Sequence, residues 1–343
     1  MKKNLLVTLA DGNYIEQAKQ LLSGAFRNAG WKGDYMLLAY RIPEKDLTWF
    51  RDRGILVKKC EAIMAEPETR IGHAPLTTLS KFYLFTTEFK KWKNIVFLDG
   101  DIIIRGSLDT LVQVKGFAAA RILNIFRTTL RGQFHQRTKK NQKLFDEVAG
   151  QYDLKRPAFN AGVMAFHTDI ISEDDFQNLK SILFQFRDII AISEETVLNI
   201  FFYDRWTELS QVYNVCPGYE LYLSGCDPGH LKAIILHTYS NFPGGKPWLS
   251  TSPLYSEWKS NLDMADRMEV TKTQAPKKIL SDQEEQQDDE YLKNLQKRYF
   301  YKLYSYKMRY FCTYNHFRLS AGAYLRKEYP RIHKLQRRLR NLE

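Results

Sequence analysis

The sequence predicts an α/β fold in which helices flank a mostly parallel sheet, followed by a basic, aromatic helical segment at the C-terminus. Short apolar runs alternate with segments of helical periodicity through residues 3–105. One run, "KNIVFLDGDIIIR" over residues 93–105, has the continuous β-branched and aromatic composition of a strand buried on both faces. Neighbouring parallel strands need crossover connections, and the intervening helical segments supply them.

The expected elements follow one another in a regular order. Strands are expected at 3–10, 34–42, 55–63 and 93–105, and helices at 14–30, 43–54 and 77–89. No GxGxxG follows the first strand and no GxxxxGKS occurs anywhere, which argues against a dinucleotide site and a P-loop.

Composition indicates an intracellular enzyme of moderate size. The 343 residues are 44% hydrophobic, enough for one large domain or two smaller ones. Four cysteines without metal-site spacing read as reduced thiols, which favours the cytoplasm. The first apolar run stops at Ala10, short of a signal peptide, and no stretch approaches the roughly 18 apolar residues of a membrane span.

The positive charge is concentrated at the C-terminal end. Residues 290–343 carry 14 Lys and Arg against three Glu, and thus nearly all of the net charge of +12. The acidic, polar run before them is typical of a solvated linker. The predicted organisation is a main domain over 1–262, a linker over 263–289 and a basic, aromatic helical tail over 290–343.

The tail interleaves tyrosine and phenylalanine with lysine and arginine. Helices with one aromatic and one basic face are suited to an anionic membrane surface, so we expect peripheral contact with the inner face of the membrane. Packing of the aromatic face on the main domain is the alternative, and nucleic acid is the least favoured partner.

Two carboxylates interrupt the buried strand at 93–105. Burying an unpaired carboxylate is costly, so such a group is protonated, paired with a cation or bound to a metal. Asp99 and Asp101 are separated only by Gly100, which lets a ligand approach closely. Two hard oxygen ligands at the carboxyl end of a strand favour Mn²⁺ or Mg²⁺, together with nucleotide phosphates, over a structural pair.

Two later stretches add candidate site residues. "RPAFNAGVMAFHTD" places Asn160 and the small Ala161 ahead of a strand, where a sugar ring could pass close to the backbone, although an ordinary turn would look the same. "AIILHTYSNFPGGKPW" leads an apolar strand into His237, a third candidate metal ligand, and then through Gly245 to Lys246. A lysine on a glycine-rich loop can hold a diphosphate.

These residues together resemble a known family. "FLDGDIII", "FNAGVMAF", "EETVLNIFF" and "LHTYSNFPGGKPW", in this order, are similar to glycosyltransferase family 8, the group of glycogenin and the bacterial lipopolysaccharide galactosyl- and glucosyltransferases. The resemblance covers about residues 1–262. It implies a GT-A fold built on a single Rossmann-like sheet, a UDP-sugar donor, Mn²⁺ and retention of anomeric configuration.

The resemblance also implies residue roles. Asp99, Asp101 and His237 would be the metal ligands, while Gly245 and Lys246 of "GGKPW" would lie at the donor phosphates. The remaining donor-binding positions that it implies are Thr8, Ala10, Asn13 and Tyr14 for the base and ribose, Lys81 as a basic residue reaching the donor, Gly100 within the DxD motif, and Asn160 with Ala161 beside the donor sugar.

One departure from the family pattern concerns the catalytic position. An Asp-Gln pair is common there, whereas this sequence has Glu194 and Glu195. The register places Glu195 under the reacting face of the sugar. A carboxylate there could stabilise positive charge or attack the sugar carbon. We expect transfer on the front face within an ion pair, with Glu195 as electrostatic support.

The predicted function is Mn²⁺-dependent, retaining transfer of a hexose from a UDP-sugar to a glycan hydroxyl in cell-surface polysaccharide or lipopolysaccharide assembly. The preferred acceptor is a lipid-linked oligosaccharide, followed by a soluble glycan or a protein. Two alternatives stay open. A haloacid-dehalogenase-like phosphotransferase could use the two acids, and an inactive protein could bind sugar nucleotides at a membrane.

Overall fold

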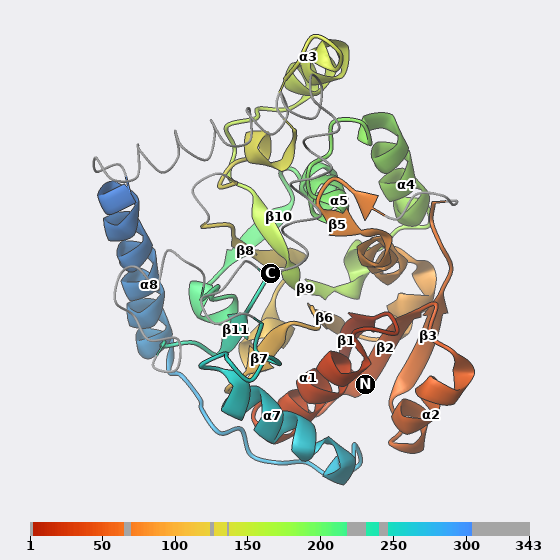
Figure 1. Ribbon diagram of the computed structural model, residues 1–343, viewed down its shortest axis with the longest axis vertical. Helices are drawn as coiled ribbons and strands as arrows, with labels where there is room; N and C mark the ends of the chain where they lie inside the picture. The colour runs from red at the N-terminus through yellow and green to blue at the C-terminus, as the bar shows by residue number, and fades with distance from the viewer. Residues whose placement is uncertain are drawn as a thin grey trace, which may run out of the picture. The chain divides into compact units, whose positions relative to one another are not determined.

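The computed structural model describes residues 3–64, 70–123, 127–135, 137–217, 231–239 and 246–303, with side chains up to residue 295 (Figure 1). The chain divides into two compact units, residues 1–293 and 294–343. The first unit contains the sheets and nearly all described helices.

The strands are β1 (Leu5–Ala10), β2 (Asp34–Tyr40), β3 (Leu56–Cys60), β4 (Arg70–Ile71), β5 (Ala74–Pro75), β6 (Asn94–Leu98), β7 (Ile102–Ile104), β8 (Phe117–Arg121), β9 (Phe159–His167), β10 (Trp206–Leu209) and β11 (Ile235–His237). The α-helices are α1 (Ile15–Arg27), α2 (Glu44–Asp52), α3 (Gln142–Gln151), α4 (Asp175–Phe186), α5 (Ser193–Phe201), α7 (Tyr255–Asp263) and α8 (Asp282–Leu303). The 3₁₀ helices are η1 (Leu76–Phe85), η2 (Thr87–Lys91), η3 (Asp109–Gln113), η4 (Leu130–Gln133), η5 (Thr168–Ile170), η6 (Gln211–Tyr213) and η8 (Ala265–Arg267).

The central sheet confirms the predicted α/β fold. In the described part of the chain it has seven strands in the order β10-β8-β9-β6-β1-β2-β3. The pairs β1–β2, β2–β3, β1–β6 and β8–β10 are parallel, and β9 runs antiparallel to both β6 and β8. This antiparallel pairing places the start of β9 beside the end of β6, with Leu98 opposite Val163.

The run at 93–105 is two strands rather than the single buried strand that its composition predicted. β6 ends at Leu98, and β7 pairs with β11 in a separate antiparallel sheet of two strands. Asp99, Gly100 and Asp101 form the turn between them. The prediction was wrong because strand propensity does not reveal that two consecutive apolar runs pair with different partners.

The helix expected at 77–89 is a pair of 3₁₀ helices, η1 and η2, separated by an extended Thr86. Threonine hydroxyls here bond to nearby backbone carbonyls: Thr78 Oγ1 donates to Pro75 at 2.9 Å and Thr86 Oγ1 to Tyr83 at 2.8 Å. Such local bonds compete with the regular helical pattern, which explains the departure from an α-helix.

The main core lies on one face of the sheet. Leu5, Val7 and Leu9 of β1 join a buried cluster together with residues of η1, α4 and α5. Leu6, which alternates with them, points to the other face. Helix α1 packs against β1, β7 and α7. The sheet is therefore covered on both faces, as its apolar strands require.

Part of helix α8 belongs to the first compact unit. Its residues 282–293 lie in the first unit, where the Tyr213 hydroxyl donates to Glu285 Oε2 at 3.0 Å. The division into main domain, linker and tail stays a prediction. The greater part of the predicted tail, residues 304–343, lies outside the described residues.

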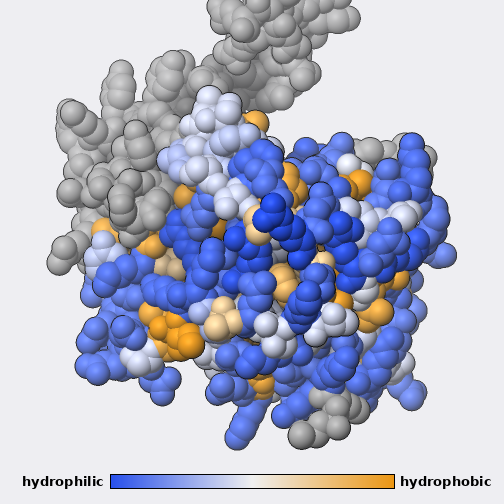
Figure 2. All heavy atoms as spheres, turned by 90° about the horizontal axis from the view of Figure 1, so that it is seen from below, coloured by the Kyte–Doolittle hydropathy of each residue, from blue (hydrophilic) through white to orange (hydrophobic). Residues whose placement is uncertain are grey.

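Among the helices that the structure describes, none has the length and apolar composition to cross a bilayer. The face in Figure 2 is mainly hydrophilic, with small, separate apolar areas.

The aromatic cluster around Phe85 should carry a large share of the stability. Its ring lies 5.1 Å from Phe166 and 5.3 Å from Phe202, centroid to centroid, and is fully buried. We expect Phe85→Ala to lower the free energy of unfolding by about 3–5 kcal/mol, because it leaves a cavity. Phe184→Ala is the matched control, since that ring is 46% exposed. Equal losses for both variants in urea titrations would contradict this description of the core.

Candidate active site

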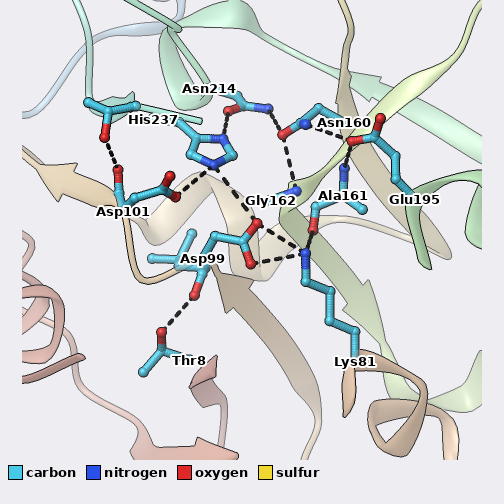
Figure 3. A network of polar contacts seen from close by, with 12 residues as sticks. Thr8, Lys81, Asp99, Asp101, Asn160, Ala161, Gly162, Glu195, Asn214 and His237 are labelled. Atoms are coloured by element: carbon cyan, nitrogen blue, oxygen red, sulfur yellow. Dashed lines mark hydrogen bonds and ion pairs between the residues drawn. The ribbon is translucent and has the colours of Figure 1, made fainter. Parts of the chain in front are cut away.

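The turn that carries Asp99 and Asp101 is held by backbone contacts on both sides. The Asp99 N–H donates to the Gly162 carbonyl of β9 at 2.9 Å, and the Asp101 carbonyl accepts from the Thr238 N–H at 3.0 Å and from its hydroxyl at 2.9 Å. The two acids are thus fixed between β9 and the end of β11. This anchoring orients both carboxylates toward one point (Figure 3).

His237 completes a group of three candidate metal ligands. One ligand atom from each of Asp99, Asp101 and His237 lies within 4.8 Å of the other two. His237 Nε2 is 3.1 Å from Asp101 Oδ1 and 3.8 Å from Asp99 Oδ2. Although buried, Nε2 has no partner of hydrogen-bond geometry among the described residues. Two carboxylates and an imidazole suit Mn²⁺, so these residues fit a divalent ion.

Lys246 lies beside the carboxylate of Asp101. Its Nζ is 2.8 Å from Asp101 Oδ2 and also contacts the Thr238 carbonyl. Burial by itself would raise the pKa of Asp101, but His237 and Lys246 outweigh burial and hold that pKa far below its usual range. Asp101 is therefore an ionised carboxylate. Gly245, the other predicted residue of this loop, lies outside the described residues.

Lys81 joins the turn to α5. Its Nζ contacts Asp99 at 2.9 Å and Glu194 at 2.8 Å, and donates to the Ala161 carbonyl at 3.1 Å. Burial lowers the pKa of this 1% exposed ammonium, but Asp99 and Glu194 outweigh burial and raise it above its usual value. Burial is also the largest influence on Asp99, whose pKa is raised even though Lys81 and His237 oppose the shift. Glu194 Oε2 is buried without a hydrogen-bond partner among the described residues.

Gly162 makes the close packing of His237 possible. A Cβ atom at this position would lie 2.0 Å from the imidazole Cε1, which no side chain can tolerate. The imidazole thus rests directly on the backbone of β9. The glycine of "FNAG" therefore allows the close approach of a protein side chain.

Glu195 is buried at the start of α5 and accepts three hydrogen bonds. Asn160 Nδ2 and the Ala161 N–H donate to its Oε2 at 2.7 and 3.1 Å, and Gln133 Nε2 donates to its Oε1 at 3.2 Å. Burial raises the pKa of Glu195 to about 7 despite these bonds, and the charge of Glu194 acts in the same direction. A buried carboxyl poised near neutrality is typical of a functional site.

The residues predicted to contact the base and ribose of the donor differ from one another in burial and in hydrogen bonding. The Thr8 hydroxyl is buried and donates to the Leu98 carbonyl at 2.8 Å. Ala10 is buried at the end of β1, and Asn13 is exposed with its N–H bonded to Asp11. Their predicted contacts with the donor stay predictions.

Tyr14 lies close to the acids. A Cβ atom at Gly100 would lie 3.3 Å from its ring, which meets Trp248 edge to face at 5.7 Å between centroids. Burial, with the charges of Asp101 and Asp99, raises the pKa of Tyr14 to about 12. The phenol is therefore neutral at physiological pH.

Sequence reasoning missed three residues of this site: Gln133, Asn214 and Trp248. Gln133 bonds to Glu195, Trp248 packs on Tyr14, and Asn214 Oδ1 lies 2.9 Å from His237 Nδ1. Trp248 ends the "GGKPW" motif, which is the sequence signal for its place in the site. Gln133 and Asn214 belong to no motif, and only folding brings them to their partners.

Comparison with known proteins places these features in a family. The model of glycosyl transferase family 8 matches residues 7–252. Glycosyltransferase GlyB of Streptococcus pneumoniae serotype 4 is 26% identical over 188 residues, which are 51% of this chain and 40% of that protein. Glycosyltransferase GlyF of the same organism is 23% identical over 146 residues, 42% and 31% respectively. The alignments thus span less than half of these relatives.

A solved structure shows the same fold. The galactosyltransferase LgtC, in complex with donor and acceptor sugar analogs, superposes with a TM-score of 0.56 at 17% identity, covering 77% of this chain and 96% of LgtC. At that identity the likeness establishes the fold, which confirms the GT-A arrangement. Since the family match covers well over half of the sequence, the chain belongs to glycosyl transferase family 8.

Proposed function

We propose that the protein is a retaining hexosyltransferase that transfers glucose or galactose from a UDP-sugar to a glycan hydroxyl with the help of Mn²⁺. The observation that carries this proposal is the convergence of Asp99, Asp101 and His237, with ligand atoms within 4.8 Å of one another. Family membership supports glycosyl transfer itself and favours it over the phosphotransferase alternative.

The charges around the acids suit the departure of a diphosphate. Bound by Asp99, Asp101 and His237, a divalent ion would neutralise charge on the donor phosphates. Lys246 would act beside it as a second cation, since its Nζ lies 2.8 Å from Asp101. Lys81 holds Asp99 in place and keeps the buried site from accumulating uncompensated negative charge.

The two glutamates would act on the sugar. Glu195, held by three donors, would face the reacting carbon and stabilise the positive charge that develops as the sugar–phosphate bond breaks. Glu194 Oε2, buried without a hydrogen-bond partner among the described residues, is available to accept from a sugar hydroxyl. The acceptor oxygen would then bond to the same face of the carbon that the diphosphate leaves.

Isothermal titration against UDP-glucose, UDP-galactose, UDP-N-acetylglucosamine and GDP-mannose, each with Mn²⁺ and with EDTA, tests this function. We expect one UDP-sugar to bind only with the metal. Binding without subsequent donor hydrolysis would favour the inactive sugar-nucleotide-binding alternative. Failure of every donor to bind would contradict the proposal.

Asp101→Asn should abolish Mn²⁺-dependent hydrolysis of that donor, with a loss of at least about 10²-fold, because the metal loses an anionic ligand. The circular dichroism spectrum should be unchanged. Asp146→Asn is the matched control, since Asp146 pairs with Arg137 at an exposed position. Full metal-dependent turnover by the Asp101 variant would show that the turn at residues 99–101 is not part of the active site.

The activity should depend on the ionisation of Glu195. Only the carboxylate supports positive charge, so kcat should rise with pH through about 7, the value to which burial raises this pKa. Glu195→Gln should lower kcat by about 10²–10³-fold and abolish this limb of the profile. Glu285→Gln is the control, because Glu285 also has a raised pKa but bonds to Tyr213 instead. An unchanged profile in the Glu195 variant would contradict the assignment.

The same pKa shift predicts an effect on stability. The pKa of folded Glu195 lies above its ordinary value of 4.5, so the folded state favours the protonated form. Stability should therefore fall as pH rises from about 4.5 to about 7. Glu195→Gln should unfold with a flatter dependence over this range, measured by urea titration at each pH. If the stability of the variant changes with pH as steeply as that of wild type, Glu195 does not cause the pH dependence.

For the acceptor, we propose a lipid-linked oligosaccharide at the inner face of an anionic membrane, with the basic tail making the peripheral contact. Deletion of residues 304–343 leaves α8 in place. This deletion should abolish flotation with phosphatidylglycerol vesicles and spare donor hydrolysis. Vesicle binding that survives the deletion would contradict the role of the tail.

A further inference from the structure

We propose that Asn214 is a positioning residue that sets the metal-binding form of His237 and the orientation of the Asn160 amide beside Glu195. It follows η6, is 6% exposed, and lies between the metal ligands and the catalytic carboxylate (Figure 3). This inference rests on the proposed function, because it assigns His237 as a ligand and Glu195 as a catalytic residue.

The backbone N–H of Gly162 fixes the orientation of the Asn160 amide. The Gly162 N–H can only donate, and it donates to Asn160 Oδ1 at 3.1 Å. The oxygen of the Asn160 amide therefore faces β9, and its nitrogen is the end that donates to Glu195 Oε2 at 2.7 Å. One backbone group thus determines which way this amide lies.

The orientation of the Asn214 amide follows. Asn160 Oδ1 faces it at 3.0 Å, so Asn214 must present its NH₂ group there. Its oxygen is then directed at His237 Nδ1, 2.9 Å away. Because a carboxamide oxygen accepts and cannot donate, Nδ1 must carry a proton. The neutral imidazole is then the form that has its lone pair on Nε2.

That form is the one a metal requires at this position. Nε2 is the ring nitrogen beside Asp99 and Asp101, at 3.8 and 3.1 Å from their oxygens. A hydrogen bond to the other ring nitrogen is the usual means by which proteins orient a ligating histidine. Here the backbone of Gly162 also packs against the ring, so little rotation is possible.

A carboxamide supplies both functions at once. It accepts from His237 and donates to Asn160, and neither a carboxylate nor a hydrocarbon side chain can do both. The aspartate and alanine variants therefore separate the two roles. Asn214→Asp retains the acceptor for His237 but places a second oxygen against Asn160 Oδ1. Asn214→Ala removes both contacts.

Free Mn²⁺ measured by electron paramagnetic resonance reports on the His237 contact without any need for turnover. Asn214→Ala should weaken Mn²⁺ binding by about tenfold or more, whereas Asn214→Asp should bind close to wild type. Hydrolysis of the UDP-sugar identified by titration reports on the other contact. At saturating Mn²⁺ and donor, both variants should lose about tenfold in kcat, because both lose the donor to Asn160.

Asn94→Ala is the control for loss of a buried amide. Asn94 is 2% exposed at the opposite end of β6 and donates to Asn4 at 3.0 Å. It should lower stability and leave Mn²⁺ affinity and kcat unchanged. Equal Mn²⁺ affinities of wild type and Asn214→Ala, or equal losses of affinity in both Asn214 variants, would overturn this inference alone. Absence of Mn²⁺ binding by the wild-type protein would overturn the proposed metal site together with it.

Discussion

The site depends on the compensation of two carboxylates placed in a mostly buried turn. Desolvation penalises Asp99 and Asp101, and the turn forms there because cationic or polar groups from other elements meet it. Lys81 comes from η1, and His237 comes from β11. Lys246 contributes a further positive charge. These groups lie far apart in the sequence, so the site exists only when the sheets and η1 are assembled.

The antiparallel strand β9 brings the other residues of the site to the two acids. Its pairing with β6 sets the start of β9 against the end of β6, where the acids lie. Three consecutive residues of β9 make different contacts. The Asn160 amide donates to Glu195, and Ala161 donates its N–H to Glu195 and accepts from Lys81 with its carbonyl. The Gly162 carbonyl accepts from the Asp99 N–H, and its backbone packs against the His237 imidazole. A parallel strand in this place would put its opposite end at the acids. The direction of one strand therefore connects the candidate metal ligands to Glu195.

The polar chain from His237 through Asn214 and Asn160 to Glu195 gives the site a single consistent arrangement of donors and acceptors. The members of a buried network of this kind are coupled, so a change at one member alters the others. Glu195 and the candidate metal ligands would then respond together to substitution. In the proposed reaction, such coupling would help to hold the departing diphosphate and the reacting sugar carbon in register.

The sequence by itself determined the fold class and the family, because alternating apolar and helical segments and the ordered motifs around Asp99, Asn160 and His237 are local features. The family resemblance also predicted a catalytic role for Glu195, and the structure places its carboxyl beside Asn160 and Ala161. Only the tertiary structure decided that the run at 93–105 divides between two sheets, that η1 and η2 are 3₁₀ helices, and that Asn214 and Gln133 belong to the site. Strand pairing and buried hydrogen bonds join residues distant in the chain, and their free energy arises only after those residues meet.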